Sequence, residues 1–236
     1  MKNRNTPAII YRLFHYSDRS AVALVFSPEF GKLKLFMPAA YNKKGGFMTL
    51  TPGSLTFDMK ETSDLHRFVS FSHDPVYYHY SQTPEIIIRL NICFDFFEHL
   101  FHQGEMCRVF WELCLKYNEN NYRKAGLYTV YRLMKEAGVM FSLQCKCGLA
   151  EGDISLKDGE LYCGKCSSPQ YEERGIPISS KTYSNLLTFH QNERFRTADF
   201  TSEEELELLM LFNNHLGAVN GNDNILKSIS VFMSMR

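Results

Sequence analysis

Four cysteines lie in two close pairs within one short polar segment: Cys145 with Cys147, and Cys163 with Cys166. Thiolate sulfur is a preferred ligand of zinc, which binds four such ligands in a tetrahedron with Zn–S bonds of about 2.3 Å. The second pair has two residues between its cysteines, a spacing that lets two sulfurs meet one metal ion across a tight turn. Gly164 inside that pair tolerates the backbone angles that such a turn requires. The spacing predicts a zinc-binding loop over about residues 142–170.

The first pair is one residue shorter than the second. In an extended chain, residues i and i+2 share a face but lie about 6–7 Å apart. Cys145 and Cys147 therefore need a kink between them in order to chelate one ion. If the ion is bound by fewer than four thiolates, we expect the fault at Cys145.

Other interpretations of these cysteines are four unrelated thiols, a pair of disulfides, and a catalytic zinc site. The sequence contains seven cysteines, an odd number, and shows no secretory signal, so we expect a reducing compartment, the cytoplasm. A catalytic zinc usually keeps an open position beside three protein ligands, and zinc deaminases add an H-x-E element that this sequence lacks. We therefore expect structural zinc and no enzymatic activity, with Cys93, Cys107 and Cys114 as ordinary packing.

The pattern of apolar residues predicts strands first and helices afterwards. Short apolar runs at about 8–16, 20–27, 31–37, 54–60 and 65–72, separated by tight turns, suit a small barrel better than an open sheet. Thr83-Pro84-Glu85 is typical of a helix start, and Thr201 with Glu204 forms a capping box. The expected fold class is α+β, with an N-terminal barrel over residues 1–80 and a helical domain over 81–236 that contains the zinc loop.

The charge of the chain is unevenly distributed. The formal net charge is zero, but residues 1–80 hold ten Lys and Arg against six Asp and Glu, which allows a surface for an anion such as a phosphate backbone. The most apolar stretch, residues 86–101, is interrupted by charged side chains. We therefore expect no membrane-spanning segment.

Four stretches taken in order, of which the third is a zinc loop in two segments, resemble the bacterial RecO family of recombination mediators over nearly the whole chain. They are the turn into the third strand (Phe30–Leu33), a basic loop (Pro38–Gly46), the two cysteine segments (Phe141–Gly148 and Leu161–Cys166) and a helical start (Leu226–Ser228). The resemblance implies an OB-fold barrel and binding of single-stranded and double-stranded DNA. It also implies partnership with RecR, with the tail of single-strand-binding protein and, indirectly, with RecA, in a bacterial cytoplasm.

Candidate DNA-binding residues follow from how OB barrels hold single strands, with cations along the backbone and aromatic rings beneath the bases. The aromatic candidates are Phe36, Tyr41, Phe47 and Phe68, and an aromatic cluster over Pro75–Tyr80 either stacks bases or joins barrel to helices. For each residue the alternative is an ordinary solvated face or a core position. The candidate cations are Lys32, Lys34, Lys43, Lys44 and Arg67 on the barrel, with Arg123, Lys124 and Arg132 on a following helix.

The sequence thus predicts a non-enzymatic DNA-binding protein of recombination and DNA repair. It would anneal strands and help to load the recombinase RecA onto single-stranded DNA coated by single-strand-binding protein. The alternative is a protein–protein adaptor of the repair machinery with little direct DNA binding. The zero net charge and the small number of cations in the loop over Pro38–Gly46 favour that alternative.

Overall fold

The structure is a computed structural model that describes residues 2–38, 40–41, 48–145, 147–148, 154–157, 159–166, 176–192, 200–221 and 226–235. The chain divides into two compact units, Met1–Tyr122 and Arg123–Arg236. Strands give way to helices near residue 80, where the sequence pattern changes. The first compact unit nevertheless extends to Tyr122, because the helices that follow the barrel pack against it.

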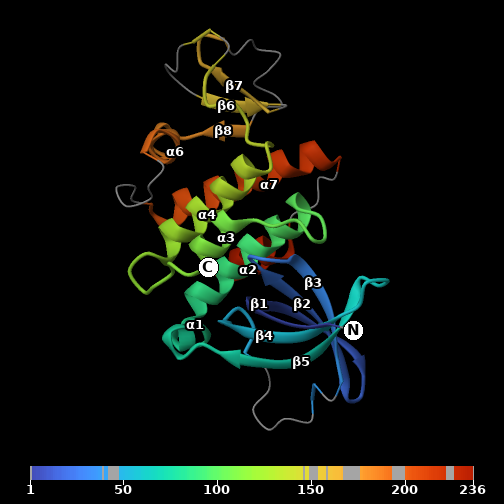
Figure 1. Cartoon of the computed structure of the whole chain (residues 1–236). Helices are drawn as coiled ribbons and strands as arrows, with labels where there is room; N and C mark the ends of the chain where they lie inside the picture. Colours follow the sequence, from blue (N-terminus) through green and yellow to red (C-terminus); the bar gives the residue numbers. More distant parts are fainter. Residues whose placement is uncertain are drawn as a thin grey trace. The chain divides into compact units, whose positions relative to one another are not determined.

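Five strands of the first unit form a closed barrel in the order β1-β2-β3-β5-β4 (Figure 1). They are β1 (Lys2–Ser17), β2 (Ser20–Ser27), β3 (Gly31–Met37), β4 (Pro52–Met59) and β5 (Leu65–His73). β3 pairs with β5 in parallel, and every other neighbouring pair is antiparallel. The chain is therefore α+β, with an OB-like barrel followed by several helices.

The barrel core is filled by side chains at alternate positions, as a closed sheet requires. The register of β1 against β2 shifts twice. Ile10 pairs with Val25 and Arg12 with Leu24, which leaves Tyr11 as an extra residue, and a second shift lies between His15 and Ser17, beside the turn into β2. Such a bulge changes which residues face outward along the strand. The inward side chains include Ala8, Ile10, Ala21, Ala23, Val25, Leu33, Leu35, Met37, Leu55 and Phe57.

Two helices cover one part of the outer barrel surface (Figure 1). After η1 (Pro75–Tyr77) and α1 (Tyr78–Gln82), the chain forms α2 (Pro84–Leu100) and α3 (Arg108–Cys114). The ring of Phe26, on β2, lies with its centroid 4.8 Å from that of Phe97 on α2 and 5.0 Å from that of Phe110 on α3. All three side chains are fully buried. This aromatic contact holds the helices on the barrel.

Polar contacts surround that aromatic cluster. The Tyr11 hydroxyl donates a hydrogen bond to Glu98, and Arg12 forms an ion pair with Asp95. Both carboxylates belong to α2, and the Asp95 side chain is buried. Each polar group that the helix buries against the strand is thereby paired, as low solvent access requires.

The second unit combines helices with a small sheet in the order β7-β6-β8. Thr201 and Glu204 form the predicted capping box, with both reciprocal hydrogen bonds present. No helix in the described part of the chain is long and apolar enough to cross a membrane. The elements are α4 (Tyr122–Glu136), β6 (Ile154–Lys157), β7 (Glu160–Cys163), β8 (Ile176–Ile178), α6 (Ser180–Asn192), α7 (Ser202–Asn220) and α8 (Lys227–Ser234).

Gly31, at the start of β3, lies where no other residue fits. Its φ is +65°, and a Cβ there would lie 2.3 Å from the carbonyl oxygen of Glu105. Gly104, in the loop after α2, has a φ of +80° but open space around it. Both glycines therefore have left-handed backbone angles. A Cβ at Gly31 would clash with main-chain atoms, whereas a Cβ at Gly104 would meet none.

We expect Gly31→Ala to lower the free energy of unfolding by about 3 kcal/mol, because backbone strain adds to a clash with main-chain atoms. Gly104→Ala should lower the free energy of unfolding by about 1 kcal/mol, since it introduces backbone strain without a clash. Urea denaturation of both variants checks this difference. Equal losses would show that the contact between β3 and the loop after α2 is not tight.

Candidate metal centre and barrel surface

The four cysteines of the predicted zinc loop meet at one point. Their sulfur atoms all lie within 4.8 Å of one another. Cys147 Sγ lies 3.4 Å from Cys145 Sγ and 3.5 Å from Cys163 Sγ. Tetrahedral bonds of about 2.3 Å to one ion would separate sulfurs by about 3.8 Å, and none of the seven cysteines is disulfide-bonded. The donor set therefore fits a four-thiolate metal site.

Both cysteine pairs lie on turns closed by the same kind of hydrogen bond. The N–H of Cys166 donates to the carbonyl of Cys163 at 2.8 Å, and the N–H of Gly148 donates to the carbonyl of Cys145 at 2.8 Å. In the first pair Gly148, with a φ of +76°, takes the fourth turn position, and Cys147 takes the third. This turn supplies the kink that the shorter spacing needs.

Burial differs among the four thiols in a way that the sequence did not indicate. Cys145, expected to be the weak point, is buried, and its sulfur accepts a hydrogen bond from the N–H of Cys163 at 3.4 Å. Cys163 is fully buried at the end of β7, where it pairs with Ile154 of β6. Cys147 is the exposed member. The hairpin of β6 and β7 thus holds the buried half of the cluster.

Hydrogen bonds among the four thiols shift their pKa values in opposite directions. Burial would raise the pKa of Cys163, but hydrogen bonds from Cys147 and from the N–H groups of Cys166 and Lys165 lower it to about 6. Hydrogen bonds with Cys147 and Cys145 raise the pKa of Cys166 to about 12. Four adjacent thiolates repel one another, and a divalent cation would remove that repulsion.

Replacement of Cys163 by serine should reduce the zinc content of the purified protein from about one ion per chain to near zero. A hydroxyl is a poor zinc ligand, and the buried hairpin offers no substitute. Cys107→Ser is the matched control, because Cys107 is the N-cap of α3 in the other unit and serine is favourable there. Elemental analysis after dialysis measures both. Equal zinc contents would exclude the cysteine cluster as the site.

His215 on α7 contacts the tip of the β6–β7 hairpin. A Cβ at Gly159, in the turn between those strands, would lie 3.0 Å from the imidazole carbon of His215. The Nε2 atom of His215 lies 2.6 Å from the carbonyl of Val139, and its Nδ1 atom is buried with no hydrogen-bond partner among the described residues. Burial lowers the pKa of His215 below the ordinary value of 6.5.

The lowered pKa predicts a pH dependence of stability. Below about pH 6.5 the unfolded chain takes up a proton at His215 that the folded chain excludes, so stability falls with pH from that point downward. Denaturant unfolding between pH 7 and 5 should show a shallower fall for His215→Gln than for the unchanged protein. A slope unaffected by His215→Gln would contradict the prediction.

The described members of the predicted DNA-binding cations of the barrel lie in two different settings. Lys32 lies against α2, where its Nζ donates to the Glu98 carbonyl at 3.0 Å and lies 3.6 Å from the Glu98 carboxylate. Lys34 and Arg67 are exposed on the outer face of the barrel. Lys43 and Lys44 are outside the described residues. Lys32 thus belongs to the packing of α2, and among the predicted cations Lys34 and Arg67 are exposed on the described barrel surface.

The predicted cations of α4 lie within the second unit. Arg123 Nε lies 3.1 Å from the buried carboxylate of Glu205, and its guanidinium also donates to the Phe200 carbonyl at 2.8 Å. Arg132 pairs with Glu136 at 2.8 Å, and Lys124 is half-buried. Arg123 therefore ties α4 to the start of α7, a role that sequence spacing alone did not indicate.

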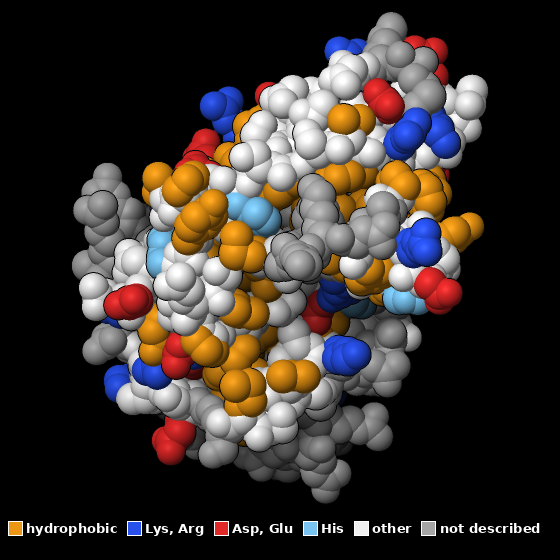
Figure 2. Space-filling view, turned by 90° about the horizontal axis from the view of Figure 1, so that it is seen from below, with side chains coloured by type: hydrophobic (Ala, Val, Ile, Leu, Met, Phe, Trp, Pro, Cys, Tyr) orange, Lys and Arg blue, Asp and Glu red, His pale blue; other side chains and the backbone are white. Residues whose placement is uncertain are grey.

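Three aromatic side chains lie beside the two open cations and form what we term the aromatic row: Phe14 and Tyr16 of β1 with Phe36 of β3. Phe14 and Phe36 flank Val22 in register across β2, and the Tyr16 and Phe36 ring centroids are 5.5 Å apart. Phe14 is 49% and Tyr16 66% exposed. Figure 2, which views the molecule from below Figure 1, shows hydrophobic side chains at the surface with Lys and Arg among them.

Lys34 and Arg67 border this row directly. Lys34 is two residues before Phe36 on the same face of β3, and Arg67 of β5 is the register partner of Phe36. Among the predicted aromatics, Phe36 is half-buried and Tyr41 is 47% exposed, whereas Phe68 belongs to the barrel core. Phe47 lies outside the described residues. The sequence interpretation missed Phe14 and Tyr16, whose outward position depends on the bulge at Tyr11.

Models of known protein families and the sequences of curated proteins were both compared with the chain, and neither comparison found a match.

Proposed function

We propose that this protein binds DNA through the aromatic row and its flanking cations, and that it acts as a non-enzymatic recombination mediator of the RecO type. The observation that carries the proposal is the exposure of Phe14 and Tyr16, with the half-buried Phe36 between Lys34 and Arg67, on an OB-like barrel. Neighbouring apolar side chains exposed as one patch are typical of interaction surfaces. OB barrels use the outer face of strands 2 and 3 for oligonucleotides.

The chemistry of this surface suits a single strand. Every base offers a flat face to Phe14, Tyr16 or Phe36, and the stacking of one base on an aromatic ring contributes about 1–3 kcal/mol. The cations Lys34 and Arg67 would neutralise phosphates, with release of counterions. Duplex DNA hides its base faces, so its contacts would rely on the cations alone, including Lys43 and Lys44 of the basic loop.

The zinc loop has a structural part in this proposal. Four thiolates around one ion leave no open position for a substrate or an activated water. The ion would instead fix the short segments that carry the two cysteine pairs. The resemblance to RecO, together with the barrel and the cysteine cluster, supports annealing of strands and loading of RecA onto coated single strands. RecR and the tail of single-strand-binding protein are the protein partners that the same resemblance implies.

A second candidate function is a protein–protein adaptor with little direct DNA binding. The observation that favours it is that Lys32, Arg123 and Arg132 are all engaged with carboxylates of this chain. Their ion pairs reduce the positive charge available to a phosphate backbone. Pull-down of partners from a bacterial lysate with and without nuclease distinguishes the two, because partners bridged by DNA are lost on nuclease treatment.

Phe36→Ala and Tyr16→Ala should each weaken binding of a labelled single strand by about 1–3 kcal/mol, since each removes a stacking surface. Arg67→Glu should weaken binding and flatten the dependence of log affinity on log salt by about one charge, and reversal of Lys43 and Lys44 should flatten it further. Fluorescence anisotropy over a salt series measures both quantities. The control is Arg108→Glu, which reverses a cation of α3 whose side chain is 86% exposed.

Two results would refute DNA binding at the aromatic row. One is an affinity that does not change with salt. The other is an equal loss of affinity in Arg67→Glu and Arg108→Glu, which would indicate a response to overall charge rather than to a defined surface.

A further inference from the structure

A second open surface of the first unit lies at the other end of β1, away from the aromatic row. It is a cleft of about 480 Å³. Its floor is a row of side chains in register across three strands, in which Pro7 of β1 pairs with Ser54 of β4 and Ser54 pairs with Ser72 of β5. All three floor residues are exposed. The cleft is therefore an open groove on the outer barrel surface, and it falls within the size range of ligand sites.

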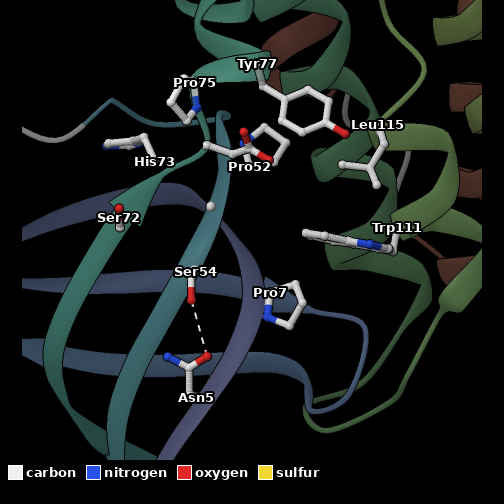
Figure 3. Close-up of a pocket in the computed structure, with 12 residues that line it drawn as sticks. Asn5, Pro7, Pro52, Ser54, Ser72, His73, Pro75, Tyr77, Trp111 and Leu115 are labelled. Carbon is white, nitrogen blue, oxygen red and sulfur yellow. Dashed lines mark hydrogen bonds between the residues drawn. The ribbon is translucent and has the colours of Figure 1, made fainter.

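The opposite wall of the cleft is aromatic and apolar. In Figure 3 the ring of Tyr77, the side chain of Leu115 and the indole of Trp111 line one side, and Pro7 and Pro52 face them. Tyr77, Leu115 and Trp111 are each half-buried, so one face of each side chain packs on the protein and the other borders the cleft. The aromatic and proline rings therefore border a narrow space into which another rigid, ring-shaped side chain fits (Figure 3).

The charge of the cleft is unfavourable for a phosphate backbone. No Lys or Arg occurs among the described residues that line it, and the charged side chain that does occur is Asp74. Asp74 is exposed, and its Oδ1 accepts the N–H of Val76 at 3.0 Å, which fixes the carboxylate at the start of η1. A nucleotide would bring its negative phosphates to this acid, whereas a cationic group would be attracted to it.

We propose that the cleft binds a proline-rich segment of a partner protein, in the extended polyproline conformation, with a basic residue next to its prolines. Aromatic-lined grooves recognise such segments because the left-handed polyproline helix is rigid before binding and loses little conformational freedom. Tyr77 and Trp111 would hold the proline rings, and Asp74 would pair with the basic residue. The Ser72 hydroxyl lies on the floor, where it can donate to a carbonyl group of the segment. The Ser54 hydroxyl already donates to Asn5 Oδ1 at 3.3 Å (Figure 3).

This site is independent of the proposed DNA-binding surface. The cleft uses the N-terminal half of β1, with β4, β5 and α3, and the aromatic row uses the C-terminal half of β1, with β2 and β3. Separate experiments therefore test the two proposals.

Trp111 is the only tryptophan in the sequence, so its fluorescence reports directly on the cleft. The probe is a capped peptide with two Pro-Pro pairs and one adjacent arginine, titrated into the full-length protein. We expect a saturable change in emission, and binding weaker by about tenfold or more for Tyr77→Ala, which loses an aromatic wall. Exchange of the arginine in the peptide for glutamate should also weaken binding, because the pairing with Asp74 is lost.

Ser72→Arg should abolish the response, because a long side chain would fill the groove and place a like charge beside the peptide arginine. Ser70→Arg is the matched control: it lies on the same strand and is also exposed, but it does not line the cleft. Urea denaturation followed by circular dichroism verifies that both variants fold. An equal response from the two variants would overturn the proposal, as would no saturable change up to about 1 mM peptide.

A short oligothymidine serves as the competing probe. Saturable quenching by the oligonucleotide that Ser72→Arg removes, with none from the peptide, would overturn the proposal and assign the cleft to a nucleic-acid base. An oligonucleotide response that Phe36→Ala removes and Ser72→Arg leaves intact would instead report the aromatic row. That result counts against the proposal only if the peptide response is also absent.

Discussion

Burial of the Phe26 ring against α2 and α3 is the constraint on which the first unit depends. Phe26 points out of the barrel, and a fully buried phenylalanine contributes roughly 1.5–3 kcal/mol relative to an exposed one. Because α2 and α3 cover this position, the part of β1, β2 and β3 around Phe14, Val22 and Phe36 stays open. The aromatic row lies there. The same contact places Trp111 of α3 beside the N-terminal half of β1, where its indole forms one wall of the cleft. The ion pairs of Lys32 and Arg12 with α2 follow from that placement.

Much of the barrel could be predicted from sequence because its strands alternate cleanly. The bounds expected for residues 20–27 and 31–37 are those observed for β2 and β3, and the helix expected from Pro84 and the capping box at Thr201 are present. Local chemistry determines these features, through turn residues, hydroxyl caps and alternation. α3 begins only at Arg108, since Cys107 makes no side-chain cap and residues 105–107 join the loop that borders β3.

The rest depended on contacts between distant segments, which sequence patterns do not contain. Nothing near Lys32 in the sequence indicates that Glu98, 66 residues away, would hold its ammonium group. The cysteine cluster lies between these cases. Its four members were recognisable from spacing, but the order of their burial was not, because it depends on the hairpin of β6 and β7. Phe14 and Tyr16 were missed for a similar reason, since alternation counted from Ala8 does not allow for an extra residue.

That extra residue, Tyr11, divides β1 into two halves that are out of phase. Before it the outward side chains stand at odd positions, such as Asn5 and Pro7, and after it they stand at even positions, such as Phe14 and Tyr16. One strand can therefore present a different surface at each end without exposing its core. A consequence arises for any comparison of this strand with another barrel. A sequence alignment without a one-residue gap at Tyr11 would pair outward residues with inward ones along half of β1. Equivalent surfaces of the two barrels would then not be recognised.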